Sequence, residues 1–211
     1  MKRPVQQAAP TAITHHTDFR ACLVGVSILI KFDSVFRTAS LIGENLFISV
    51  DSNISPDGGV FVLVGSSGEE EDSLEPRWFK EIKQVLRCGS LALYSFMPKE
   101  DWRMSVNARV CKNVQDGMTV FKLGAGTLLT SGVVQDSKVD GDTFEVVSNL
   151  LAPFAFSADI GALVFTIDKV VVGAIKEVRH RFVDKKVFMR VFVQRIPSEM
   201  LEKINTLQTP V

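Results

Sequence analysis

The stretch "FAFSADIGALVFTIDKVVVGAIKE", residues 154–177, contains a tight turn followed by two short apolar segments. The turn is Ala158-Asp159-Ile160-Gly161-Ala162, and the apolar segments cover residues 162–167 and 169–175. Asp and Gly next to runs of Val, Ile, Phe and Thr are typical of strands joined by turns. The turn is unusual in one respect, because the residue at its centre is an isoleucine and carries no reactive atom.

The same pattern of short apolar segments continues through most of the chain. The segments are rich in Val, Ile, Phe and Thr, and Gly, Asn, Asp or Ser usually separate neighbours. They cover residues 21–30, 35–42, 45–50, 59–64, 91–96, 106–111, 118–123, 127–135, 143–148, 162–167, 169–175 and 187–195. Short strands at this regular spacing predict an all-β sandwich or barrel.

Two segments depart from this pattern. Residues 77–87 fit either a short helix or an irregular strand. Residues 197–206 predict a helix, because Pro197 is tolerated in a first turn and three apolar residues follow at helical spacing.

The composition limits the classes of function. The chain has 211 residues, 46% of them hydrophobic, which is enough for one sizeable domain or two small ones. Lys and Arg number 24, as do Asp and Glu, so the net charge is zero and non-specific nucleic-acid binding is disfavoured. The charge is nevertheless uneven: residues 69–75 carry five acids, whereas residues 176–195 carry seven Lys or Arg and two acids.

The cysteines and histidines indicate neither a disulfide framework nor a metal site. Cys22, Cys88 and Cys111 are odd in number and widely spaced, and no histidine lies at zinc-ligand spacing from them. We therefore expect reduced thiols, no metal and no cofactor. No apolar signal segment precedes residue 21, and the run 21–30 is much shorter than the roughly 20 residues that span a bilayer. We expect an intracellular protein of the cytoplasm or nucleus, neither secreted nor bound to a membrane.

The chain divides into a tail and two β halves. Residues 1–19 are polar without periodicity and predict a flexible tail. The polar segment 98–105 lies near the midpoint and is interpreted as a linker. The predicted units are an N-terminal β half over 20–100 and a C-terminal β half with the final helix over 101–211.

Two six-stranded halves, a midpoint linker and a C-terminal helix resemble the trypsin-like, chymotrypsin-fold serine proteases over residues 20–207. In that family the nucleophile turn reads Gly-Asp-Ser-Gly-Gly or Gly-Asp-Ser-Gly-Ala, and a Val-Val-Gly strand follows. Residues 158–162 read Ala-Asp-Ile-Gly-Ala, and 170–174 read Val-Val-Val-Gly-Ala. Residues 122–124 and 130–134 are similar to the family's preceding stretch. The resemblance implies two six-stranded antiparallel β-barrels with a C-terminal helix.

The same resemblance places the catalytic triad on residues that cannot perform its chemistry. The family's histidine ends a strand that matches 47–52, so Ser52 falls at its position, or Asp51 if the register slips by one. The family's aspartate falls on Ser90 and its nucleophile on Ile160. The resemblance therefore implies a degenerate member, a pseudoprotease without enzyme activity.

Acyl transfer by this fold needs a nucleophile, a base and a group that orients the base. Isoleucine has no lone pair, and serine is not a base near neutral pH. The histidines are His15 and His16 in the predicted tail and His180 in a basic stretch after the segment that ends at residue 175. None of them is expected beside the turn.

The turn itself is expected to be kept for packing. The family's oxyanion hole uses the N–H groups of the nucleophile and of the Gly two residues earlier, which here is Ala158. An alanine suits that role only if the backbone does not require a positive φ. Gly161 is expected to supply a sharp turn and Asp159 to accept backbone hydrogen bonds beneath it. Ile160 either lines an open cleft or belongs to the core.

We expect a protein–protein interaction module or scaffold subunit that binds a protein partner or an extended peptide by β-augmentation. The acidic segment 68–76 and the basic segment 176–190 are candidate contacts, although both also fit solvated loops and hairpins. Their opposite charges allow head-to-tail association into a homo-oligomer.

Two other functions remain open. RNA could bind the basic segment 176–190, where Phe182 and Phe188 are interspersed. Its basic residues are Lys176, Arg179, Arg181, Lys185, Lys186 and Arg190. A residual hydrolase could use Ser157 or one of the cysteines with His180.

Overall fold

The computed structural model of the chain describes residues 27–32, 35–43, 45–50, 61–64, 79–98, 109–123, 129–148, 153–183 and 186–208. Several predicted features lie outside the described residues: the tail 1–19 with His15 and His16, Cys22, Asp51 and Ser52, the acidic segment 68–76 and the boundary near residue 101.

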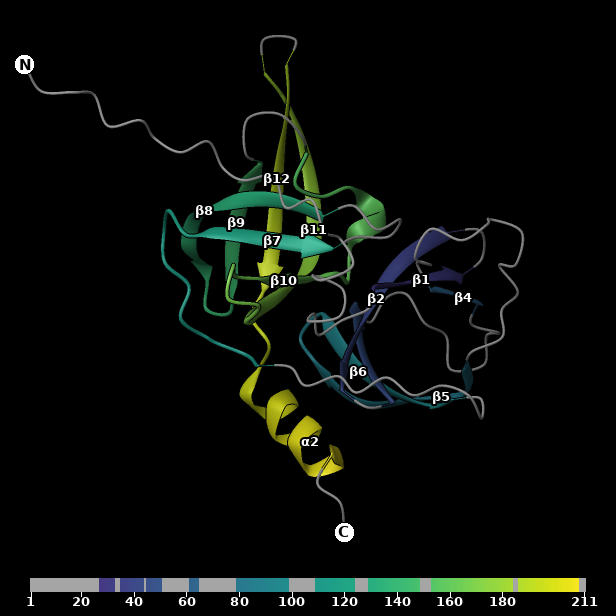
Figure 1. Cartoon of the computed structure of the whole chain (residues 1–211). Coiled ribbons are helices and arrows are strands. Elements are labelled where there is room, and N and C mark those ends of the chain that lie inside the picture. The colour runs from purple at the N-terminus through teal and green to yellow at the C-terminus, as the bar shows by residue number, and fades with distance from the viewer. Residues whose placement is uncertain are drawn as a thin grey trace, which may run out of the picture.

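The first half of the chain forms one antiparallel sheet of six strands (Figure 1). Its strands are β1 (Ser27–Phe32), β2 (Val35–Gly43), β3 (Leu46–Val50), β4 (Phe61–Val64), β5 (Phe79–Cys88) and β6 (Leu91–Pro98). They pair in the order β4-β1-β2-β3-β6-β5. Within the described residues the edge strands β4 and β5 do not pair with each other, so the predicted closure of this half into a barrel is not seen there.

The second half forms a closed barrel in the order β10-β11-β12-β9-β8-β7. Its strands are β7 (Thr119–Leu123), β8 (Leu129–Asp140), β9 (Thr143–Ser148), β10 (Leu163–Phe165), β11 (Val171–Val183) and β12 (Lys186–Gln194). A short 3-10 helix, η3 (Ser157–Asp159), precedes β10, and the chain ends with α2 (Ser198–Gln208). The prediction of a mostly β fold with a six-stranded barrel and a C-terminal helix is confirmed.

The secondary structure of two segments was determined by strand pairing rather than by their own sequence. The ambiguous residues 77–87 contribute to β5, which is a strand with register shifts between Lys80 and Lys83 and between Gln84 and Leu86. The strand predicted over 106–111 is wrong for its described part, where Val110 makes only a single parallel bridge to Val171. Beyond Ala174 this edge of β11 is occupied by β12, so there is no room for a longer ladder.

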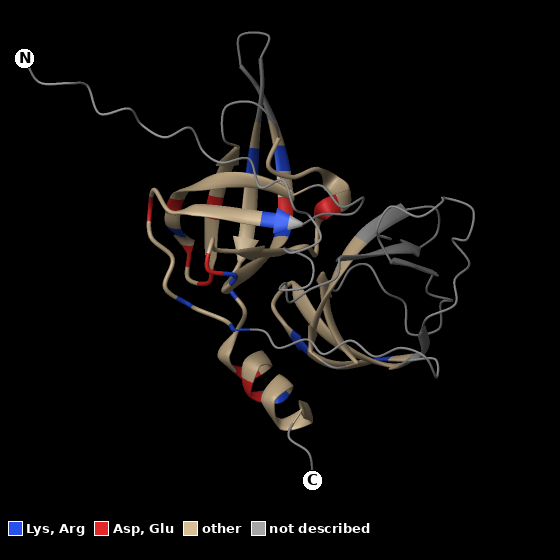
Figure 2. Ribbon diagram, viewed as in Figure 1, with Lys and Arg blue, Asp and Glu red and all other residues tan. Residues whose placement is uncertain are grey.

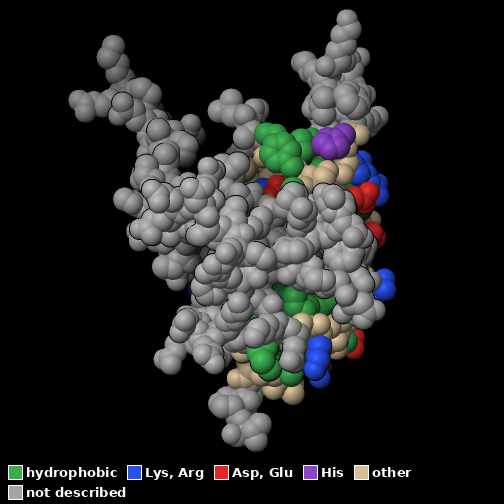
Figure 3. Space-filling model, turned by 90° about the vertical axis from the view of Figure 1, so that its right-hand side faces the viewer, with side chains coloured by type: hydrophobic (Ala, Val, Ile, Leu, Met, Phe, Trp, Pro, Cys, Tyr) green, Lys and Arg blue, Asp and Glu red, His purple; other side chains and the backbone are tan. Residues whose placement is uncertain are grey.

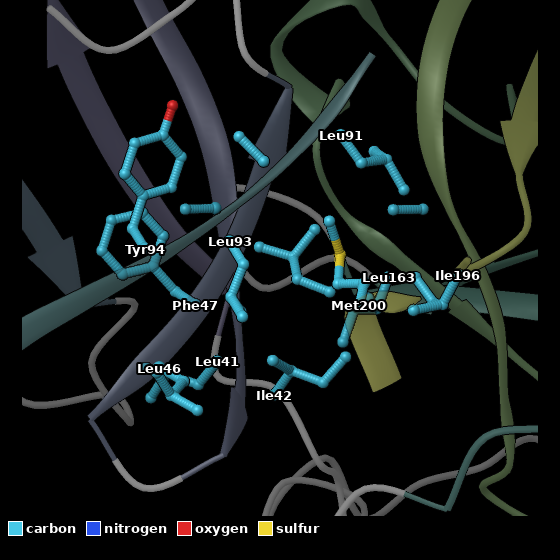
Figure 4. Close-up of a cluster of buried hydrophobic side chains, with 14 of the residues drawn as sticks. Leu41, Ile42, Leu46, Phe47, Leu91, Leu93, Tyr94, Leu163, Ile196 and Met200 are labelled. Atoms are coloured by element: carbon cyan, nitrogen blue, oxygen red, sulfur yellow. The ribbon is translucent and has the colours of Figure 1, made fainter. Parts of the chain in front are cut away.

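The hydrophobic cluster beneath the first sheet joins the two halves (Figure 4). Leu41, Phe47 and Leu93 come from the first sheet, and Leu163 and Met200 reach them from β10 and α2. Burying a side chain of this size stabilises the fold by about 1.5–3 kcal/mol. The helix α2 is thus held by its apolar stripe, as the sequence predicted. It has 11 residues, and no helix in the described part of the chain is long and apolar enough to cross a membrane.

A second cluster fills the closed barrel. It is made of inward-facing side chains of the barrel strands, joined by residues from the segment before η3. Its fully buried members include Val120, Phe144, Val146, Phe154, Val164, Val172, Ile175, Val191 and Val193. The turn that follows η3 lies where the two clusters meet, because Ile160 packs against both.

Candidate functional site

The turn 158–162 is anchored to both halves of the molecule. The Thr38 N–H of β2 donates to the Ile160 carbonyl at 3.2 Å, and the Thr38 Oγ1 hydroxyl donates to the Ala158 carbonyl at 2.7 Å. From the other side, the Gly161 N–H donates to the Ile175 carbonyl at 2.8 Å. Ile160 itself is partly buried. It therefore fills part of the junction between the halves, which is closer to the core alternative than to an open cleft.

Gly161 supplies the sharp turn that the sequence predicted. Its φ is +98°, and a Cβ atom at this position would lie 1.9 Å from the Thr38 carbonyl oxygen. Any side chain would be strained by the backbone angle and would also collide with β2. The glycine is thus required for the close approach of the two halves.

The N–H group of Ile160, the residue that the sequence resemblance matched to the family's nucleophile, is already used within the turn. The Ile160 N–H donates to the Ser157 carbonyl at 3.4 Å, and the Asp159 N–H donates to the Phe156 carbonyl at 2.9 Å, which makes η3 a 3-10 turn. Ala158 is not among the described residues with positive φ, so an alanine fits there without strain. Stabilisation of an oxyanion needs N–H groups aimed at the place where negative charge develops. In this turn the N–H of Ile160 is instead aimed at a carbonyl.

A buried ion pair lies beneath the turn. Lys122 of β7 and Asp159 are both almost inaccessible, with 2% and 5% of their side chains exposed, and the Lys122 Nζ lies 2.5 Å from Asp159 Oδ2. The same oxygen accepts the Phe156 N–H at 2.8 Å, as expected for Asp159. Burial lowers the pKa of Lys122, and the neighbouring Asp159 carboxylate partly offsets this effect. Sequence reasoning missed Lys122, although a lysine within the apolar strand "TVFKL" was a visible anomaly.

Ser90, matched to the family's aspartate, is committed to a contact between the halves. Its Oγ donates to Gln194 Oε1 at 2.5 Å, and Gln194 Nε2 donates to the Cys88 carbonyl at 3.2 Å. Gln194 is buried at the end of β12. Ser90 therefore helps to join the turn between β5 and β6 to the barrel, and no described histidine is bonded to it.

The structure does not bring the alternative nucleophile Ser157 together with His180. Ser157 is exposed at the start of η3. His180, the one histidine among the described residues, lies on β11 five residues beyond Ile175. At the rise of a strand this separation is about 16 Å. His180 is exposed beside hydrophobic side chains on the outer surface (Figure 3).

The surroundings of Cys88 do not activate its thiol. The Cys88 Sγ lies 3.8 Å from the Glu199 carboxylate of α2, and burial together with that carboxylate raises the pKa of the thiol. A thiol with a raised pKa is a poor nucleophile near neutral pH. The Cys111 Sγ accepts the N–H of Asn113 at 3.3 Å in a local turn. Within the described ranges no three His, Cys, Asp or Glu side chains gather as metal ligands would.

Arg179 of β11 and Arg190 of β12 are each paired with a carboxylate. Arg179 pairs with Glu177 through two hydrogen bonds of 2.6 and 2.9 Å, and Arg190 pairs with the buried Glu145 in the same bidentate manner. The two guanidinium groups lie 4.6 and 5.3 Å from the centre of the Phe192 ring. These arginines are therefore engaged with the barrel surface, which weakens the case for RNA binding.

Among the described residues, one edge of β11 has no strand partner next to the turn. One edge of β11 pairs with β12 from Ala174 to Val183. The other edge pairs with β10 only up to Ala174 and with the turn at Ile175. From Lys176 onward, the described residues include no strand partner on that second edge. An unpaired edge presents backbone donors and acceptors to which an extended peptide can add.

The arrangement of the two halves matches known structures along almost the whole chain. The inactive form of Rv3671c from M. tuberculosis H37Rv aligns with a TM-score of 0.61 and 13% identity, over 99% of this chain and 99% of that one. The chain has the chymotrypsin fold. Kallikrein-related peptidase 10 aligns with a TM-score of 0.60 and 11% identity, over 89% of this chain and 96% of that one. The MamO protease domain from Magnetospirillum magneticum gives 0.57 and 16%, over 86% and 96%.

At these identities the likeness establishes the fold and leaves the chemistry to be argued from the residues. By sequence, no protein-family model matches the chain, and no curated protein matches it.

Proposed function

We propose that the protein is a pseudoprotease, a catalytically inactive protein of the chymotrypsin fold that acts as a protein-interaction module. One observation supports the proposal: the N–H of Ile160, the residue that the sequence resemblance matches to the family's nucleophile, is donated to the Ser157 carbonyl within η3. The turn thus offers neither a nucleophile nor the oxyanion donor expected there.

The binding activity is assigned to the open edge of β11 beside the turn. An extended peptide would add to this edge as a strand, with main-chain hydrogen bonds for affinity and side-chain contacts for selectivity. Phe156, the residue just before η3, has 50% of its surface exposed and offers an apolar contact. A large exposed aromatic ring suits a peptide that carries an apolar residue.

Incubation of the purified protein with a complex peptide pool, read by mass spectrometry for cleavage and for retention, tests both parts. We expect no new peptide termini above background and a retained set that shares a motif. New termini that disappear in Ser157→Ala or after thiol alkylation would overturn the claim of inactivity.

A matched pair of variants tests the location of binding. Phe156→Ala removes the exposed ring beside the turn, whereas Ile167→Ala removes a side chain that is 58% exposed between β10 and β11. We expect Phe156→Ala alone to reduce peptide retention. Equal retention by both variants would refute binding at this edge while leaving the claim of inactivity untouched.

A further inference from the structure

The β11–β12 hairpin continues beyond the barrel as an arm, which we define as Arg179–Val183 of β11 with Lys186–Arg190 of β12 (Figure 1). The neighbouring strand β9 pairs with β12 only from Arg190 to Gln194. On the other side, β10 leaves β11 at Ala174. Within the described residues the arm is therefore a two-stranded ribbon with both outer edges unpaired.

A ribbon of this kind needs a partner on physical grounds. Two isolated strands are only marginally stable in water, and unpaired strand edges readily accept a further strand. The strand β11 is 13 residues long, which is longer than its pairing with β10 requires, because β11 meets β10 over residues Val171 to Ala174 only. The excess length makes the arm a candidate interaction surface.

The charge of the arm selects the chemistry of the partner. At its base, Arg179 and Arg190 are paired with Glu177 and Glu145. Figure 2 shows Lys and Arg on both strands where the hairpin leaves the barrel. Beyond this base, residues 180–189 contain three Lys or Arg and one Asp in the sequence, so a positive excess remains. Two such arms would repel each other, whereas an acidic segment would be attracted.

The chain contains a segment of the required charge. Residues 69–75, which lie outside the described part, carry five acids and no Lys or Arg. We propose that the arm of one copy binds residues 69–75 of a second copy, and that the reciprocal contact closes a two-fold dimer. This interaction does not depend on whether the protein is catalytically inactive, because it uses the arm rather than the turn at Ile160.

Sedimentation of the whole chain over a range of concentrations tests the proposal. At about 0.1 M salt we expect a monomer–dimer equilibrium, which weakens at about 1 M salt as the Debye length falls from about 10 Å to about 3 Å. Reversing the arm charges with Arg181→Glu and Lys186→Glu should raise the dimer dissociation constant by at least about tenfold. Reversing the acids with Glu69→Lys and Glu70→Lys should do the same.

Mixing the two reversed variants supplies the decisive readout. The arm-reversed chain keeps its acidic segment and the acid-reversed chain keeps its arm, so one complementary contact is restored and an equimolar mixture should associate more tightly than either variant alone. Lys83→Glu with Lys203→Glu is the matched control, since both lysines are exposed and lie off the arm; this variant should dimerise like the unmodified chain. Any one of four outcomes would overturn the proposal. These are a monomer at every concentration, association that salt does not weaken, dimers of the arm-reversed variant as stable as those of the unmodified chain, and a mixture that stays monomeric.

Discussion

Replacing Lys122 by methionine should destabilise the fold strongly, because it leaves a buried carboxylate without its cation. Asp159 is 95% inaccessible in its side chain, and Lys122 and the Phe156 N–H are the donors to its Oδ2 atom. Methionine matches the length and volume of the lysine stem, so the change removes charge with little loss of packing. Breaking one partner of a buried ion pair costs about 3–5 kcal/mol.

The magnitude can be checked by thermal and urea unfolding. For a chain of this size, 1 kcal/mol shifts the melting temperature by about 2–4 °C, so the expected loss is about 6–20 °C. The double variant Lys122→Met with Asp159→Asn is the informative control, because it removes both charges while Asn can still accept the Phe156 N–H. We expect it to be more stable than Lys122→Met alone, with a clear coupling between the two positions.

Two outcomes would refute this reasoning. A loss below about 1 kcal/mol for Lys122→Met would mean that Asp159 finds solvent or another donor. Additive losses in the double variant would mean that the two side chains do not act on each other, and that the turn is held by its hydrogen bonds with Thr38 and Ile175.

Two further predictions concern Gly161 and Cys88. Gly161→Ala should lower the free energy of unfolding, measured in urea, by several kcal/mol. Gly117→Ala is the control: its φ is also positive, but nothing lies within 4 Å of its Cβ position, so it should cost only about 1–2 kcal/mol. Similar losses for the two variants would refute the collision with β2. At about pH 8, Cys88 should be alkylated more slowly than an ordinary thiol, because its raised pKa keeps it protonated, and its rate should climb as the pH rises. Glu199→Gln should lower that pKa and speed alkylation, read by peptide mass mapping, whereas Glu202→Gln on the same helix should leave the rate unchanged.

The local elements could be predicted because their causes lie within a few residues. The strand 143–148 follows from its β-branched and aromatic residues between turn residues. The apolar stripe of α2 follows from helical spacing and from the tolerance of Pro197 in a first turn. The sequence prediction failed where a strand distant in the sequence determined whether a segment could pair. Residues 109–111 could not become a strand because β12 occupies the adjoining edge of β11.

Much of the candidate site was beyond the reach of sequence reasoning. The bond from Thr38 Oγ1 to the Ala158 carbonyl joins residues 120 positions apart, and no local pattern encodes it. The pairing of Lys122 with Asp159 and of Ser90 with Gln194 likewise arises only when separate strands are packed together. A polar residue in an apolar strand signals that a partner must exist, but not which one.

By itself, the sequence determined the order of strands and turns, the sharp bend at Gly161 and the lack of a nucleophile at Ile160, because each depends on the identity of residues that are neighbours in the chain. Only the tertiary structure decided that the N–H of Ile160 is aimed at a carbonyl, that Ile160 packs between the two hydrophobic clusters and that β11 and β12 extend beyond the barrel. These features depend on the direction of the backbone and on which strands pair at each sheet edge. The residue types limit both of these but do not specify them.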